Sequence, residues 1–83
     1  MTAKELKSQA EEIGRMVAFH RKKSGLTQLG AAKLAGIGKA AVFDIEHGKT
    51  SVQFDTLQKL LGVLNIKIRY ESPLMQAFRS WKK

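Results

Sequence analysis

The side chains that could perform chemistry in this chain are few, and their spacing argues against catalysis. The sequence has two histidines, His20 and His47, in separate predicted helices, and it has no cysteine. It also lacks a glycine-rich phosphate loop and a pair of histidines at metal-binding spacing on one helix. We therefore expect a protein that is not an enzyme and that needs no metal and no cofactor.

Positive charge is the feature of the composition that says most about a partner. The 83 residues include 15 Lys and Arg against 7 Asp and Glu, a formal net charge of +8, and 43% of them are hydrophobic. That apolar content predicts a folded domain, and excess positive charge on a small domain favours a polyanion, such as nucleic acid or an acidic membrane surface. The alternative is that the cations only keep a small protein soluble.

A membrane partner is the less favoured of these readings. The longest apolar stretches, Met16–Phe19 and Leu60–Leu64, are too short to span a bilayer, and the cations are spread over the chain instead of following one amphipathic face. The N-terminus has no apolar core of the kind that signal peptides contain. Without cysteine there is no disulfide framework, which fits a reducing, cytoplasmic compartment.

The elements that must position any functional side chain begin with two helices. Apolar residues at three- and four-residue intervals predict one helix over about residues 10–23, and another that begins near Phe54 and continues to Leu64. Cations in the last turn of the first helix suit the negative end of its dipole. The length allows one domain, so both helices should share a single core.

Between them, two shorter helices are joined by a tight turn. Thr27 is placed to cap a helix over residues 28–35, and the next should run from Gly38 or Lys39 to about His47. Helices that cross steeply need a small residue at their contact, a turn residue that tolerates positive φ, and branched apolar residues that face back. The sequence provides all of these in order, as Ala32, Gly36, Ile37, Val42 and Ile45. The pattern predicts a helix-turn-helix.

The hydrophobic period changes from helical to alternating after Asn65. Ile66, Ile68 and Tyr70 alternate with charged residues, which is typical of a strand with one face in water. One strand cannot satisfy its own backbone groups, and no second strand is predicted. We therefore expect a strand over residues 66–72 that pairs with the same strand of a second copy in a symmetric homodimer.

A short helical stub or tail is predicted over residues 73–83. Ser72 and Pro73 are typical of an N-cap and a first helical residue, and Leu74, Phe78 and Trp81 would then share one face. Aromatic side chains at this spacing make good buried anchors, so we expect the stub to dock a protein partner. A loosely ordered tail and a contact within the dimer are the alternatives.

The same residues show a resemblance to a known family. Over roughly residues 13–65, the chain resembles the Xre/Cro class of phage-repressor-like DNA-binding domains in the run Leu26-Thr27-Gln28, Ala32, Gly36-Ile37, Val42, Ile45-Glu46 and Gly48-Lys49. With its added strand it is similar to HipB-type antitoxins, which dimerise through that strand and bind a HipA-type kinase toxin. The fold class expected is therefore all-α: a phage-repressor-like four-helix domain over residues 10–65, plus one C-terminal β-strand that pairs across a homodimer.

The resemblance places the third helix in the major groove of DNA, with its N-terminal residues at base edges. We expect Lys39 to read guanine, Ala40 and Phe43 to touch a thymine methyl group, and Asp44 to accept from a cytosine amine. A phosphate contact by Lys39, packing of Phe43 on a neighbour, and a solvated role for Asp44 are the alternatives. Phosphate contacts are expected from residues that flank this helix, namely Thr27, Gln28, Gly38, His47, Lys49, Thr50 and Ser51.

The resemblance also implies a structural ion pair between Arg21 and Glu46. The expected function is that of a transcriptional repressor that binds a palindromic double-stranded operator in the cytoplasm, at the nucleoid. Its expected setting is a type II toxin–antitoxin operon, in which it acts as a HipB-like antitoxin of a HipA-like kinase toxin. The alternative is an autonomous Xre-family regulator with no toxin partner.

Overall fold

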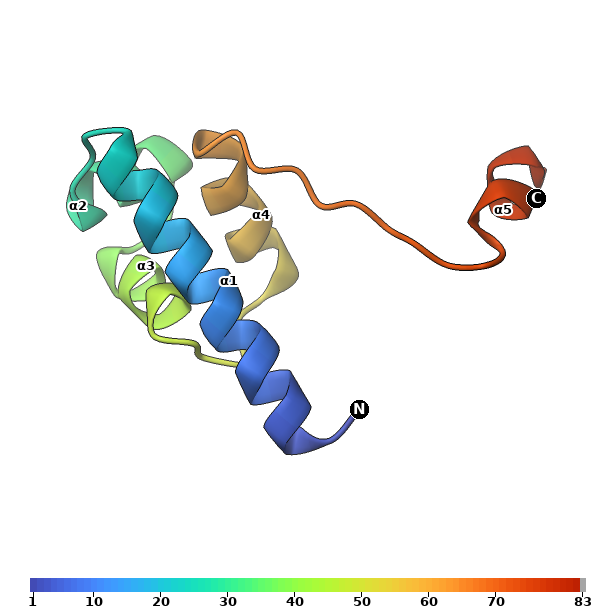
Figure 1. The fold of residues 1–83 in the computed structure, drawn as a ribbon. Helices are drawn as coiled ribbons and strands as arrows, with labels where there is room; N and C mark the ends of the chain where they lie inside the picture. Colours follow the sequence, from blue (N-terminus) through green and yellow to red (C-terminus); the bar gives the residue numbers. More distant parts are fainter. Residues whose placement is uncertain (83) are drawn as a thin grey trace.

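The computed structural model describes residues 1–82, and over that part of the chain the fold is all-α, as the sequence predicts. Its helices are α1 (Ala3–Lys23), α2 (Gln28–Ala35), α3 (Lys39–Glu46), α4 (Phe54–Val63) and α5 (Met75–Ser80). The first four pack into one helical body, and the chain then leads away from this body to α5 (Figure 1). No helix within residues 1–82 is long and apolar enough to cross a membrane.

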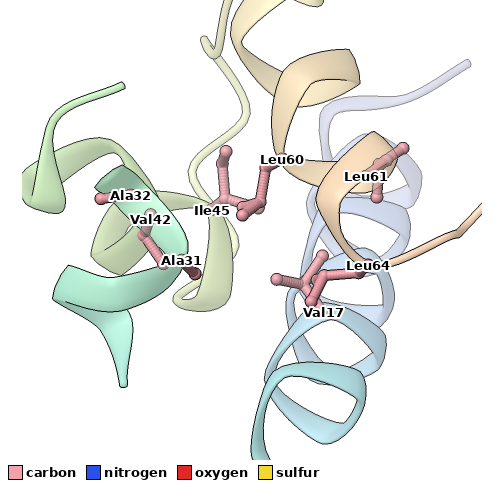
Figure 2. Packing of buried hydrophobic residues seen from close by; sticks show 8 residues of the cluster. All are labelled: Val17, Ala31, Ala32, Val42, Ile45, Leu60, Leu61 and Leu64. Carbon is pink, nitrogen blue, oxygen red and sulfur yellow. The ribbon is translucent and has the colours of Figure 1, made fainter. Parts of the chain in front are cut away.

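The core of the helical body is built around α3, which packs against α1, α2 and α4. Val17, Val42 and Leu60, from three different helices, are its largest fully buried side chains. The inward residues predicted for α3, Val42 and Ile45, are both buried, so this prediction is confirmed. Figure 2 shows the whole cluster, which consists of Val17, Ala31, Ala32, Val42, Ile45, Leu60, Leu61 and Leu64.

The cap of α2 and the turn between α2 and α3 are formed by the predicted residues. The Thr27 hydroxyl accepts a hydrogen bond from the Gly30 amide at 2.9 Å and so caps α2. Gly36 ends the helix with a φ of 70°, a conformation that favours glycine, and the Ile37 amide then donates to the Ala32 carbonyl at 3.0 Å. Because Ala32 is 1% exposed and small, α3 can pack closely at this point.

The first helix is longer than its apolar pattern. α1 begins at Ala3 and not near Ala10, because Thr2 and Glu5 form a capping box. The Thr2 hydroxyl accepts from the Glu5 amide at 3.1 Å, and the Glu5 carboxylate accepts from the Thr2 amide at 3.2 Å. Leu6 is the only large apolar residue of the added turns, so periodicity alone could not detect them.

The segment after α4 differs from its prediction. Residues 66–72 form no strand in the described chain; they are drawn out without regular structure (Figure 1). Ile66 packs against the edge of the core, whereas Ile68 and Tyr70 are 37% and 61% exposed. A ladder needs a second strand, and residues 1–82 provide none, so the alternating pattern has no partner within one chain.

The two later helix starts have different outcomes. The helix predicted to begin near Phe54 does begin there as α4, and Phe54 itself is 62% exposed. Ser72 does not cap α5: its carbonyl accepts from the Met75 amide at 3.1 Å in a turn, and Leu74 is the N-cap residue without a capping side chain.

Candidate nucleic-acid interface

The outward face of α3 lies beside the N-terminus of α2. Lys39, Ala40 and Phe43 from α3 line an open groove of about 450 Å³ together with Gln28, the first residue of α2. These α3 residues are exposed, and Phe43 has 48% of its surface in solvent. Because the opposite face of α3 is held in the core, the orientation of this row of side chains is fixed. The groove therefore presents one cation, one methyl group and one aromatic ring to the outside.

Asp44, which was expected to read a base, is paired with Lys49, which was expected to contact a phosphate. The Lys49 ammonium lies 3.5 Å from the Asp44 carboxylate, and their side chains are 52% and 39% exposed. The Lys49 amide also donates to the Asp44 carbonyl at 3.0 Å. An exposed ion pair contributes at most about 1 kcal/mol, so it can open when an anion approaches.

Phe43 packs on His47, one turn further along. The two rings are stacked, with centroids 3.9 Å apart and an angle of 22° between their planes. His47 Nδ1 lies 2.8 Å from the Phe43 carbonyl oxygen; since a carbonyl only accepts, Nδ1 is the protonated nitrogen of this bond. One face of Phe43 is thus covered by His47, and the remainder stays open to solvent.

The other residues expected at phosphates lie at helix ends and in the loop after α3. Thr27 and Gly38 are the N-cap residues of α2 and α3, where backbone amides favour an anion. His47 is the C-cap residue of α3, and residues 49–51 are exposed. Of the residues expected at phosphates, Gln28 lines the groove itself, and the others cap α2 or α3 or follow α3 in the chain.

Arg21, Gln28 and Glu46 form a network that joins α1, α2 and α3. The Glu46 carboxylate accepts from Arg21 Nε at 2.6 Å and Nη2 at 3.0 Å, and from Gln28 Nε2 at 3.1 Å. Arg21 Nη1 donates to the Leu26 carbonyl at 2.9 Å. The side chains of Arg21 and Glu46 are only 10% and 5% exposed. Gln28 therefore has two roles: it lines the groove, and its amide is oriented by Glu46.

The network shifts the titration of both charged members. Burial by itself raises the pKa of Glu46, but the hydrogen bonds from Arg21 and Gln28 and the charges of Arg21 and Lys22 outweigh it, so this pKa lies below its ordinary value. The hydrogen bond to Glu46 raises the pKa of Arg21 against the opposing effect of burial. Glu46 thus stays ionised to a lower pH than an ordinary glutamate.

A comparison with known families identifies the domain. A family model described as Helix-turn-helix matches residues 19–70. The chain belongs to the helix-turn-helix family. The Xre-type resemblance seen in the sequence is thereby confirmed.

The helix-turn-helix domain also has named relatives. Over 55 residues it is 38% identical to the HTH-type transcriptional regulator PuuR of Escherichia coli (strain K12) and to the regulator of the same name from Shigella flexneri. The alignment covers 66% of this chain but 30% of each regulator. The chain thus spans about 30% of the length of these curated relatives.

Two residues that support the helix-turn-helix were missed in the sequence. Gly14 lies where α1 crosses the end of α3, and a Cβ there would be 2.5 Å and 2.6 Å from the carbonyl oxygens of Ile45 and Glu46. Lys7 donates from Nζ to the Gly48 carbonyl at 3.0 Å. A glycine within a helical pattern was a signal for the first contact; no local pattern indicated the second.

The side chains expected to dock a partner are exposed. Leu74, Phe78 and Trp81 are 73%, 59% and 62% exposed, and together with Ala77 they line a shallow hollow of about 310 Å³ on one side of α5. This short helix lies apart from the helical body (Figure 1). No group of three or more metal-ligating side chains occurs within residues 1–82.

Proposed function

We propose that the chain is a sequence-specific transcription regulator that inserts α3 into the major groove of double-stranded DNA. One observation supports this more than any other: α3 exposes Lys39, Ala40 and Phe43 beside the N-terminus of α2 while its opposite face is buried in the core. In helix-turn-helix proteins the helix in this position reaches the base edges. The net charge of +8 adds attraction to phosphates, and both named relatives are described as transcriptional regulators.

The proposed base contacts follow from the chemistry of the exposed row. Lys39 donates to guanine O6 or N7, and Ala40 and Phe43 contact a thymine methyl group. Asp44 accepts from a cytosine N4 amine once its pair with Lys49 opens. In this arrangement the stacking of His47 limits the positions that the Phe43 ring can take.

The proposed phosphate contacts surround these base contacts. Amides and side chains at Thr27, Gln28 and Gly38 face one strand of DNA at the helix N-termini. His47 and the loop residues Lys49, Thr50 and Ser51 face the backbone on the other side of α3. Such contacts set the register of α3 on the duplex and contribute most of the salt-dependent affinity.

We propose further that two copies bind DNA together as a symmetric homodimer. The alternating segment 66–72 leaves Ile68 and Tyr70 exposed, and it has no ladder partner among residues 1–82. Antiparallel pairing with a second copy would satisfy its backbone groups and bury these side chains, together with Ile66, on one face. The operator should then be near-palindromic, with half-sites about one helical turn apart. A bound dimer acts as a repressor when its operator overlaps a promoter. The dimer would act at the nucleoid, in the cytoplasm.

Selection from a pool of random duplexes tests this function. The parent chain should enrich a two-fold symmetric sequence. Lys39→Ala should alter the preference at one base pair of each half-site and weaken the selected site by about 1–3 kcal/mol, roughly 5- to 150-fold. Lys33→Ala makes the same charge change in the last turn of α2 and should leave the preference unchanged. An unchanged selected sequence and affinity for Lys39→Ala would contradict the assignment of α3.

A second candidate function is that of an antitoxin in a type II toxin–antitoxin operon. It is favoured by α5, whose apolar side chains Leu74, Phe78 and Trp81 are exposed and make no part of the core. In this role the stub docks a HipA-like kinase toxin while the helical body holds the operator. The competing possibility is an autonomous regulator without a toxin.

Co-purification with a kinase distinguishes the two roles. An antitoxin should co-purify from its host with a larger protein that autophosphorylates with ATP. Removal of residues 74–83 should abolish this complex and leave operator binding intact. A complex that survives the truncation would contradict docking by the stub, and operator binding without any associated kinase would favour the autonomous regulator.

A further inference from the structure

We propose that the N-terminal part of α1 extends the DNA-binding surface, with Lys7 as an additional contact to the phosphate backbone. The inference rests on the proposed function, since it concerns the same DNA complex. It assigns a binding role to residues that precede the matched helix-turn-helix region, which begins at residue 19.

Lys7 belongs to α1, and its side chain reaches the start of the loop after α3 that is proposed to contact phosphates. Its Nζ donates to the carbonyl oxygen of Gly48 at 3.0 Å, and Gly48 directly precedes Lys49, Thr50 and Ser51. The backbone of α1 is also close here, because a Cβ on Gly48 would lie 2.7 Å from Glu11 Cγ and 3.2 Å from Glu11 Cα. Lys7 is therefore held beside this loop by packing as well as by its hydrogen bond.

The charges around Gly48 give Lys7 a role that its neighbours do not fill. α3 has no basic residue in its own last turn, and Lys49 is paired with Asp44. Glu11 adds a second carboxylate on the same side of α1 as Lys7, four residues further on. Lys7 and Lys49 thus balance the carboxylates of Asp44 and Glu11 at this point, and without Lys7 the formal charge here would be −1, which would repel a phosphate.

The bond to Gly48 leaves Lys7 able to bind an anion. An ammonium group has three donors, and the carbonyl of Gly48 takes one of them. Lys7 is exposed, so its remaining donors are accessible to water or to an anion. A phosphate that reaches the amides and hydroxyls of residues 49–51 would lie within reach of Lys7 and Lys49 together, and would release counterions from both.

Salt dependence separates a phosphate contact from a structural role. The affinity of the full chain for its selected duplex is measured at salt concentrations from about 50 to 200 mM for the parent, Lys7→Gln, Lys7→Arg and Lys33→Gln. Lys7→Gln should make the negative slope of log K against log salt shallower by about 0.9 and weaken the binding of all duplexes similarly. Lys7→Arg should keep the parent slope. Lys33→Gln, a matched change at the far end of α2, should also keep it.

Two results would overturn the inference while leaving the proposed function in place. One is a Lys7→Gln variant that binds with the parent affinity and slope. The other is weaker binding with an unchanged slope, which would mean that Lys7 only supports Gly48. A parent chain that shows no salt-dependent binding to any duplex would overturn the proposed function itself, so the two failures are distinguishable.

Discussion

Glu46→Ala removes the acceptor at the centre of the network that joins α1, α2 and α3. In the parent, the Glu46 carboxylate accepts hydrogen bonds from Arg21 Nε at 2.6 Å, Arg21 Nη2 at 3.0 Å and Gln28 Nε2 at 3.1 Å. The Arg21 side chain is 10% exposed, so water cannot replace the lost carboxylate fully. The variant leaves the guanidinium with the Leu26 carbonyl, at 2.9 Å, as its remaining partner.

The size of the loss follows from the burial of the pair. Removing one member of a buried ion pair costs about 3–5 kcal/mol, because the other charge stays uncompensated. In a domain of this length, each kcal/mol changes the melting temperature by roughly 4–8 °C. We therefore expect Glu46→Ala to lower Tm by on the order of 20 °C.

Thermal and urea unfolding, followed by far-ultraviolet circular dichroism, measure this loss. Asp44→Ala is the matched control, since its pair with Lys49 is exposed and should contribute less than about 1 kcal/mol. Arg21→Met combined with Glu46→Leu should recover most of the stability, because no charge is left buried alone. If Glu46→Ala unfolds at the same temperature as Asp44→Ala, the reasoning about a buried charge is refuted.

Two further predictions concern backbone contact and acid stability. Gly14→Ala should have a much lower melting temperature than the parent, because its Cβ would lie 2.5 Å and 2.6 Å from backbone oxygens. Gly62→Ala is the control: it has open space around it and should be more stable than the parent by up to about 1 kcal/mol. Equal melting temperatures for the two variants would contradict the close crossing of α1 and α3. Because the folded state lowers the pKa of Glu46, the unfolded chain binds its proton first as pH falls. The contribution of Glu46 to the free energy of unfolding should then be lost as the pH falls below about 4. Glu46→Gln should lose less stability in acid when followed by urea titrations, and an equal loss would contradict the shift.

The helix-turn-helix could be predicted from the sequence because its requirements are local. Thr27 caps α2 within three residues, and Gly36 ends it with positive φ. Once Val42 and Ile45 are assigned to the core, the helical period places Lys39, Ala40 and Phe43 on the outward face of α3. Each of these positions depends on residues only a few places away in the chain.

The parts that could not be predicted depend on contacts between distant segments. Gly14 is needed because α1 crosses the end of α3, and Lys7 reaches Gly48 across 41 positions of sequence. The pairing of Gln28 with Glu46 is likewise a contact between two helices. The strand at residues 66–72 was predicted from its alternation, but alternation states only that one face is apolar; whether a ladder forms depends on a partner outside the chain.

The proposed function depends on contact between the outward face of α3 and duplex DNA. Titration of the ¹⁵N-labelled full chain with a selected duplex, followed by amide chemical shifts, tests it most directly. We predict the largest changes at Thr27, Gln28, residues 38–44 and residues 47–51, with little change on the exposed face of α4. Shifts confined to α4 and the segment 66–82, or a spectrum unaffected by the duplex, would contradict the account.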